Sequence, residues 1–268
     1  FPGETPFDRA ISQAYEPGSV VKILTMSAAL DSNTVRPDTT FLDTGIISYG
    51  GWNIYNWDRG AWGWQDMTGC LAHSLNVCLA WVSTTMGNDL FYSYMQRFGL
   101  GHPTGIDLAG EGSGRLKLPG DDDWYTVDLA TNAFGQGVAI TPIQLVMAAS
   151  ALANNGQMVY PHILYAKVED GRQREMGTQV VGGPISAATA HTITEMLANA
   201  LESESSDALI PGYRIAGKTG TAQIPDVGGY NESEINASFI GWGPVENPQF
   251  LVFVWLEQPQ INRAASVV

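Results

Sequence analysis

The spacing of apolar residues changes part-way along this chain, and that change constrains the fold most. Up to about residue 201 the apolar residues recur mostly with a helical period. From residue 213 the period becomes two, as in strands with one buried face. Helices in the middle and an antiparallel meander at the end indicate an α+β fold. The pattern predicts helices over 19–30, 68–98, 142–154 and 187–201, and strands over 158–168, 213–219, 235–242 and 249–257. For the second helix the alternative is a break near Gly87.

Local signals mark the ends of several of these elements. Thr141 can cap the third helix, with Pro142 at its first position, and Ser186 can cap the fourth. The turn-forming residues of 243–248 separate the last two strands, so we expect these strands to pair as a hairpin.

Composition limits the partners of the chain. Its 268 residues allow one large domain or two small ones. The net charge of −14 makes nucleic acid an unfavourable partner. No apolar run is long enough to span a bilayer, and no signal peptide is present. Because the chain lacks an initiator Met and ends abruptly, we expect it to be part of a longer protein.

Cysteine and tryptophan residues give two structural expectations. If 67–85 is one helix, Cys70 and Cys78 lie about 12 Å apart along it, too far for a disulfide. We therefore interpret both as packed thiols, which say little about the redox compartment. A cluster of tryptophans is expected to form a small satellite core, and the alternative is an aromatic wall beside a cleft. Its members are Trp52, Trp57, Trp62 and Trp64.

Ser19 and Lys22 form the first of three short motifs. Their three-residue spacing places both side chains on one face at the start of a helix. A serine hydroxyl needs a base to become a nucleophile, and lysine can be that base when burial and nearby positive charge lower its pKa. An S-x-x-K match alone is expected about once by chance in a chain of this length.

Ser74-Leu75-Asn76 is the second motif, and it lies in an apolar block where polar side chains need partners. Ser74 could relay a proton between Lys22 and a leaving group. Asn76 could orient Lys22 and bind a substrate amide. The alternative for this motif alone is a polar kink within helical packing.

Lys218-Thr219-Gly220-Thr221 is the third and most specific motif, at the end of a predicted strand. Lys218 offers a cation and the threonines offer hydroxyls, which suits a substrate carboxylate. Gly220 lets a substrate backbone approach closely. The backbone N–H groups of Thr221 and Ser19 could together form an oxyanion hole. The alternative is a charged strand end. Two of only four lysines lie inside the three motifs, so acyl transfer through an acyl-serine is favoured.

Other chemistries find no support in the sequence. No metal site is indicated, because the histidines are scattered and no metal-binding spacing occurs. The glycine-rich segments 110–114 and 135–137 lack a full dinucleotide fingerprint, so we interpret them as turns and expect no cofactor. No Gly-x-Ser-x-Gly elbow is present. The histidines are His73, His102, His162 and His191.

Together the three motifs resemble those of the penicillin-recognising serine acyltransferases, and the surrounding segments resemble the transpeptidase domain of class B penicillin-binding proteins. The resemblance covers nearly the whole chain. It is carried by 15–19, 105–111, 134–142, 218–223 and 238–242.

The resemblance implies a single transpeptidase domain over 1–268, with an α/β/α sandwich of antiparallel sheet and helices beside an all-helical lobe. It implies cross-linking of peptidoglycan stem peptides ending in D-Ala-D-Ala to an amine acceptor, with Ser19, Lys22 and Ser74 catalytic. Asn76, Lys218, Thr219, Gly220 and Thr221 would bind substrate. β-Lactams would acylate Ser19. The expected location is the cell envelope, at the outer face of the cytoplasmic membrane, in a cell-wall synthesis complex.

The family also has parts that we expect to be missing here. They are an N-terminal anchor, a non-catalytic domain, the first sheet strands and the last helix. Without those strands and that helix the sheet would have an exposed edge. Alternatives on the same scaffold are a D,D-carboxypeptidase, a β-lactamase, or a non-catalytic β-lactam sensor or divisome scaffold. No clear match to the deacylating glutamate of class A β-lactamases is found, so fast β-lactam hydrolysis is not expected.

Overall fold

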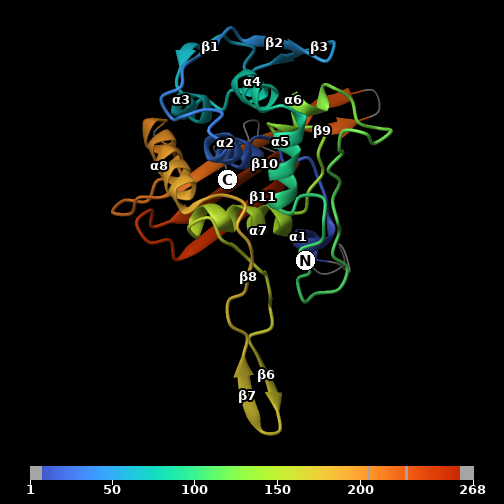
Figure 1. Ribbon diagram of the computed structural model, residues 1–268, viewed down its shortest axis with the longest axis vertical. Coiled ribbons are helices and arrows are strands. Elements are labelled where there is room, and N and C mark those ends of the chain that lie inside the picture. The colour runs from blue at the N-terminus through green and yellow to red at the C-terminus, as the bar shows by residue number, and fades with distance from the viewer. Residues whose placement is uncertain (1–7, 205, 227–228, 260–268) are drawn as a thin grey trace.

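The computed structural model describes residues 8–204, 206–226 and 229–259. Its largest sheet has three antiparallel strands in the order β11-β10-β9, and helices pack against it (Figure 1). This arrangement agrees with the predicted α+β class. The strands are β9 (Ala216–Asp226), β10 (Gly229–Gly243) and β11 (Phe250–Glu257). Both chain ends, where family segments are expected to be missing, lie outside the described residues.

The predicted hairpin of the last two strands is confirmed. Strands β10 and β11 pair in register from Gly243 opposite Phe250 to Asn236 opposite Glu257. The connecting turn contains a cis peptide bond before Pro244. Strand β9 begins slightly later than predicted, at Ala216, and it continues well beyond residue 219 alongside β10.

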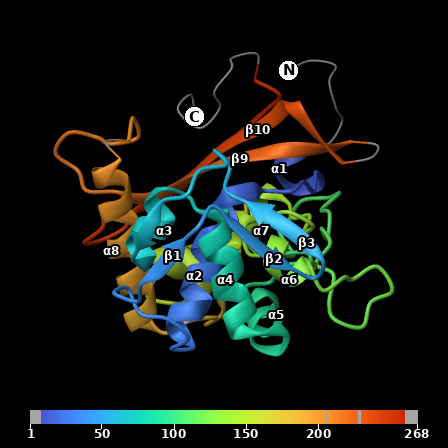
Figure 2. The ribbon, with the colours of Figure 1, turned by 90° about the horizontal axis from the view of Figure 1, so that it is seen from above.

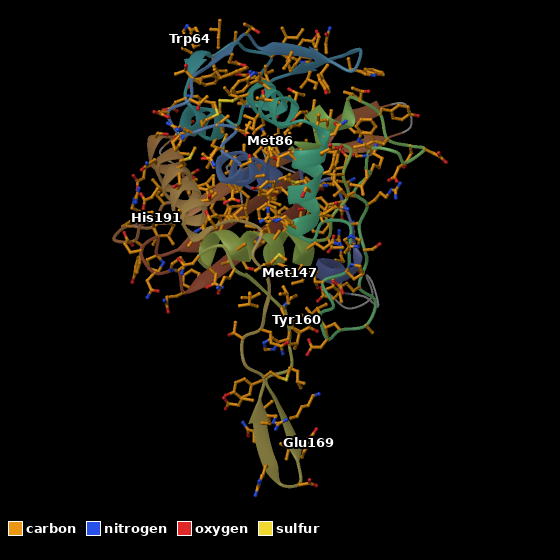
Figure 3. All side chains as sticks on the ribbon, viewed as in Figure 1. Trp64, Met86, Met147, Tyr160, Glu169 and His191 are labelled. Carbon is orange, nitrogen blue, oxygen red and sulfur yellow. A yellow bond between two sulfur atoms is a disulfide. The ribbon has the colours of Figure 1, made fainter. Side chains whose placement is uncertain are left out.

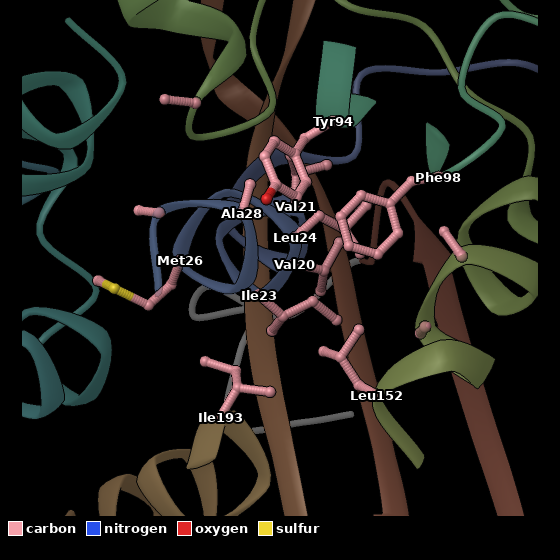
Figure 4. Packing of buried hydrophobic residues seen from close by; sticks show 14 of the residues in the cluster. Val20, Val21, Ile23, Leu24, Met26, Ala28, Tyr94, Phe98, Leu152 and Ile193 are labelled. Atoms are coloured by element: carbon pink, nitrogen blue, oxygen red, sulfur yellow. The ribbon is translucent and has the colours of Figure 1, made fainter. Parts of the chain in front are cut away.

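Helix α2 (Lys22–Asp31) is the centre of the helical half, and every side chain from Lys22 to Ala29 is buried. A helix enclosed on all sides is typical of a core element. In Figure 4, Ile23 lies between Ile193 and Leu152, which come from the helices α8 and α7. The helices around α2 are α4 (Asn76–Met86), α5 (Asn88–Arg97), α7 (Pro142–Ala153) and α8 (Ala187–Ser203).

Both predicted helix caps are confirmed. Thr141 and Gln144 form a capping box at the start of α7, with a hydrogen bond from Thr141 N to Gln144 Oε1 of 2.9 Å. The Ser186 hydroxyl accepts a hydrogen bond from Thr189 N at the start of α8. The helix predicted from residue 19 instead begins as a 3₁₀ turn, η1 (Gly18–Val21), before α2.

The single strand predicted over 158–168 is wrong. Its first residues pair with one strand and its last residues with another, while 160–165 lie between them without strand pairing. Pro161 has no N–H to donate to a ladder, and the Asp107 carboxylate accepts hydrogen bonds from the backbone N–H groups of Ile163 and Leu164. The four short strands are β5 (Met158–Val159), β6 (Ala166–Glu169), β7 (Arg172–Glu175) and β8 (Val180–Gly182).

Strands β6 and β7 form the tip of an arm that projects from the body of the molecule (Figure 1). Figure 3 places Tyr160 near the base of the arm and Glu169 toward its tip.

The remaining elements are short. Strands β1 (Phe41–Asp43) and β4 (Gly63–Gln65) pair, as do β2 (Ile46–Tyr49) and β3 (Trp52–Tyr55). Strands β1, β2 and β3 lie over α4, as Figures 1 and 2 show, and β4 packs against α3. The short helices are α1 (Arg9–Ser12), α3 (Met67–Ala72) and α6 (Asp128–Asn132).

The single helix predicted over 67–85 is also wrong. The interpretation of Cys70 and Cys78 as packed thiols is wrong for the same reason. The chain leaves the helical conformation after α3, and Ser74 has a left-handed backbone with φ of +55° before α4 begins. This break brings the Cα atoms of Cys70 and Cys78 to 6.1 Å, and the two residues form a disulfide. The estimate of about 12 Å failed because it assumed an unbroken helix.

The satellite core expected from the tryptophans is not formed. Trp52, Trp57 and Trp64 are 68%, 72% and 70% exposed, and Trp62 is 38% exposed. Trp64 lies at the outer surface of the β1–β4 pair (Figure 3). Trp62 has an aromatic partner, because its ring stacks on His73 with 3.9 Å between the ring centroids.

Candidate active site

Lys22 is the central residue of the candidate site. It is the first residue of α2 and is fully buried. Its Nζ donates hydrogen bonds to the Ser74 carbonyl oxygen (2.6 Å), to Ser74 Oγ (3.1 Å) and to Asn76 Oδ1 (2.8 Å). Burial, and secondly the positive charge of Lys218, hold the pKa of Lys22 well below its usual value. The structure thus brings three of the predicted residues into direct contact, around a buried amine whose pKa is lowered.

The turn that carries Ser74 is fixed by backbone contacts and by the disulfide. Ser74 N donates to the Leu71 carbonyl, and Leu75 N donates to the Cys70 carbonyl. The Cys70–Cys78 bond closes a ring that contains the whole Ser74-Leu75-Asn76 motif. Both oxygens of Ser74 can therefore face Lys22 from one left-handed residue.

Asn76 is held from its other side by the β2–β3 hairpin. Its side-chain Nδ2 donates to the Tyr55 carbonyl at 3.1 Å, while its Oδ1 accepts from Lys22. The neighbouring Asn56 accepts a hydrogen bond from Val77 N and donates to the Asp43 carboxylate. The amide of Asn76 is thereby oriented by partners on two separate elements.

Strand β9 lies directly against the turn η1 that carries Ser19. A Cβ built on Gly220 would lie 2.9 Å from Val20 Cγ1 and 2.5 Å from Ser238 Oγ. A Cβ built on Gly18 would lie 2.8 Å from the Cβ of Ala222, and Gly18 has a φ of +63°. Only glycine fits such approaches, so two glycines allow the first and third motifs to meet. Ser19, between Gly18 and Val20, is half-buried beside this strand.

Lys218 brings a second buried amine to the site. It is 4% exposed, and its Nζ donates to the carbonyl oxygen and, at 3.4 Å, to the hydroxyl of Thr219. Burial lowers the pKa of Lys218 to about 8, and the Glu204 carboxylate opposes that effect. The side chain of Thr219 is half-buried, and that of Thr221 is exposed.

Comparison with known proteins gives the family. The family model described as the penicillin binding protein transpeptidase domain matches residues 5–268. The chain belongs to this family. Stage V sporulation protein D of Bacillus subtilis is 35% identical over 92% of this chain and 38% of its own length. Penicillin-binding protein PbpB of Mycobacterium tuberculosis is 33% identical over 94% of this chain and 39% of its own length.

Solved structures confirm the fold of this transpeptidase-family chain. Penicillin binding protein 3 of Mycobacterium tuberculosis, complexed with aztreonam, matches with a TM-score of 0.87 and 30% identity. That match covers 97% of this chain and 60% of the solved one. The chain spans about two fifths of the length of the curated relatives named above.

Two observations bear on other classes of site. Among the described residues, no cluster of potential metal ligands is present. No described helix combines the length and apolar character that crossing a membrane requires.

The segment 135–137, interpreted from its glycines as a turn, directly supports the turn η1 that carries Ser19. Gly135 O accepts a hydrogen bond from Gly18 N at 3.1 Å, and a Cβ on Gly135 would lie 2.2 Å from Gly18 O. Glu16 accepts a hydrogen bond from Gly137 N at 2.9 Å. The available signal was the pair of glycines, Gly135 and Gly137, which indicated a turn but not what the turn contacts. Both have a positive φ in the structure.

Sequence reasoning missed a further pair beside the site. Nδ1 of His73, the residue before Ser74, lies 2.9 Å from Oε1 of Glu204 at the end of α8. No pattern joins these residues, because they come from different elements far apart in the chain.

Proposed function

We propose that this chain is the catalytic domain of a D,D-transpeptidase that cross-links peptidoglycan stem peptides ending in D-Ala-D-Ala. The observation that carries the proposal is the buried Lys22 amine in contact with both Ser74 oxygens and Asn76. A neutral amine beside a helix-start serine is what activation of a hydroxyl requires. Relatives of this chain named peptidoglycan D,D-transpeptidase FtsI, from Escherichia coli, support the same reaction, at 30% identity over 98% of the chain.

In the first half-reaction, Ser19 Oγ forms a bond to the carbonyl carbon of the penultimate D-Ala, and its proton passes to Lys22 Nζ. The peptide C–N bond then breaks, and the departing amine of the last D-Ala takes a proton through Ser74 Oγ, which lies 3.1 Å from Lys22 Nζ. The backbone N–H groups of Ser19 and Thr221 stabilise the negative oxygen formed in between.

In the second half-reaction, an acceptor amine attacks the acyl carbon. The ester bond to Ser19 breaks, the amine proton passes to Lys22, and Ser19 recovers its proton. A β-lactam enters the same first step, but its opened ring stays attached and blocks the acceptor.

The remaining predicted residues bind the substrate. Lys218, Thr219 and Thr221 hold the terminal carboxylate, and Asn76 binds a peptide amide. Gly220 leaves room for the substrate chain beside β9, which is an edge strand of the described sheet.

The substrate sets the place of action. The names of several relatives refer to peptidoglycan, which implies a location in the cell envelope. We place this chain at the outer face of the cytoplasmic membrane. It works there within a cell-wall synthesis complex.

Intact-mass spectrometry with benzylpenicillin tests the proposal. We expect one long-lived adduct per chain, mapped by peptide analysis to Ser19 and lost in Ser19→Ala. Ser32→Ala, at the other end of α2, is the matched control and keeps the adduct. An unmodified wild-type chain contradicts the proposal.

A second assay separates the reaction types. A stem peptide with an amine acceptor should give a cross-linked product together with free D-Ala. Release of D-Ala without cross-linking identifies a carboxypeptidase, rapid turnover of a chromogenic cephalosporin identifies a β-lactamase, and clean acylation without peptide turnover identifies a sensor.

A further inference from the structure

Asp43 is a buried acid that belongs to none of the three motifs. It is the last residue of β1 and is 1% exposed. Its Oδ2 accepts two hydrogen bonds of 2.8 Å, one from Asn56 Nδ2 and one from the backbone N–H of Trp62. Its Oδ1 is also buried and has no hydrogen-bond partner among the described residues. A carboxylate buried with one oxygen unpaired costs stability, so its presence calls for an explanation other than packing.

The first contact of Asp43 leads to the residue that follows Asn76. Asn56 is 2% exposed, and its Nδ2 donates to the Gly60 carbonyl oxygen as well as to Asp43. These two acceptors orient the amide so that Asn56 Oδ1 accepts a hydrogen bond of 3.1 Å from Val77 N. Val77 is the second residue of α4, where a backbone N–H has no partner within the helix, and the N-cap residue of α4 supplies no side-chain acceptor. Asn56 therefore caps α4 from a distant part of the chain.

The same stretch also holds the side chain of Asn76. The carbonyl oxygen of Tyr55, the residue before Asn56, accepts a hydrogen bond from Asn76 Nδ2 at 3.1 Å. The other end of that amide, Oδ1, accepts from Lys22 Nζ at 2.8 Å. Two consecutive residues at the end of β3 thus contact the first two residues of α4, and Asp43 orients the amide that makes one of these contacts.

The second contact of Asp43 leads to the residue that precedes Ser74. The backbone of Trp62 is held by Asp43, and its indole ring stacks on the ring of His73 with 3.9 Å between the centroids. His73 is followed directly by Ser74, whose carbonyl oxygen and hydroxyl both accept hydrogen bonds from the buried amine of the site. One carboxylate oxygen is therefore connected to both flanks of the second motif.

We propose that Asp43 is a positioning residue, which acts through Asn56 and Trp62. By fixing both flanks of the Ser74-Leu75-Asn76 motif, it keeps the oxygens of the motif directed at Lys22. The position of the motif rests on the contacts given above, whereas the effect on acylation rests on the proposed function. The alternative is an acid that supports the packing of α4 as a whole, and the two roles predict different results.

Backbone amide shifts measured by NMR test the position without any substrate. Asp43 makes no contact with Val77, yet in Asp43→Ala the amide proton of Val77 should move upfield, because Asn56 loses the partner that orients it. The amide of Val82, in the second half of the same helix, should stay in place. An unmoved Val77 amide, or equal movement along all of α4, overturns the proposal.

Acylation by benzylpenicillin tests the consequence for the site. Asp43→Ala and Asn56→Ala should each slow acylation at least about tenfold, which is the factor expected for one lost hydrogen bond. The double variant should match Asp43→Ala within about threefold, because Asn56 transmits part of the effect of Asp43. Losses that multiply in the double variant overturn the proposal.

Asn53→Ala is the matched control. It removes an asparagine from the same strand, β3, whose side-chain oxygen accepts a hydrogen bond from the Ser48 hydroxyl instead of taking part in these contacts. It should acylate at the wild-type rate, and a tenfold loss in this variant as well overturns the proposal.

A rescue experiment decides if Asp43→Ala does not fold. Asn56→Asp keeps an oxygen for Val77 N, and a proton shared between its carboxylate and that of Asp43 replaces the lost amide donor. In mildly acidic buffer it should acylate within about threefold of the wild-type rate. A rate as low as that of Asn56→Ala overturns the proposal. A wild-type chain that benzylpenicillin never acylates defeats the proposed function instead, while the amide shifts still decide the role of Asp43.

Discussion

Replacing Lys218 by methionine should make this protein more stable at pH 7, although Lys218 is proposed to bind substrate. The amine is 4% exposed, and burial lowers its pKa from 10.5 to about 8. That difference corresponds to about 3 kcal/mol of unfavourable charge burial. The variant also loses the hydrogen bond to the Thr219 carbonyl oxygen, worth about 1 kcal/mol. We therefore expect a net gain of about 2 kcal/mol in the free energy of unfolding.

The gain should depend on pH in a fixed direction. Because the pKa of Lys218 is lower in the folded state, the unfolded chain binds more protons between about pH 8 and 10.5. The free energy of unfolding of the wild type therefore rises with pH between about pH 8 and 10.5. Below about pH 8, burial of the charged Lys218 destabilises the folded state by its full amount. The advantage of Lys218→Met should shrink above pH 8 and disappear near pH 10, where the lost hydrogen bond offsets what remains of the charge penalty.

Urea unfolding at pH 7 and pH 10, followed by circular dichroism, measures both effects. Lys167→Met, on the exposed strand β6, is the matched control and should change stability by less than about 0.5 kcal/mol. A Lys218→Met variant less stable than wild type at pH 7, or an advantage of equal size at both pH values, would refute the reasoning.

Three further predictions concern the site. Lys22→Arg should fold but lose at least about a thousandfold in penicillin acylation rate, because guanidinium stays protonated; a wild-type rate contradicts the assigned base. The Cys70→Ala, Cys78→Ala double variant should lose about 2.5 kcal/mol of unfolding free energy in urea, as expected for removing a cross-link between residues eight positions apart, and a loss below about 0.5 kcal/mol contradicts this. Gly18→Ala should reduce acylation at least about tenfold because its methyl group meets β9, whereas Gly51→Ala, equally left-handed but with nothing within 4 Å, should not.

Local chemistry made part of this structure predictable from the sequence. The caps at Thr141 and Ser186 depend on residues a few positions away, and the turn before β11 depends on its own glycine and prolines. The contact of Lys22 with Ser74 and Asn76 is long-range, yet it followed from the chemistry, since a base, a relay and an amide have to meet in order to act.

The errors arose where a single residue or a distant partner decides the structure. The apolar spacing of 67–85 continues through Ser74, so nothing in the pattern shows that this residue turns left-handed. The disulfide was then excluded by a correct distance argument applied to the wrong backbone. The exposure of Trp52, Trp57 and Trp64 also could not be predicted, because aromatic content does not show which side of a short hairpin faces the core.

The division of labour between the two amines gives a reason why the motifs alone are insufficient. The motifs bring Lys22 and Lys218 together by glycine contacts and buried packing, and those same contacts lower the pKa of both. Packing cannot by itself decide which amine keeps its proton, since it disfavours the charge on each.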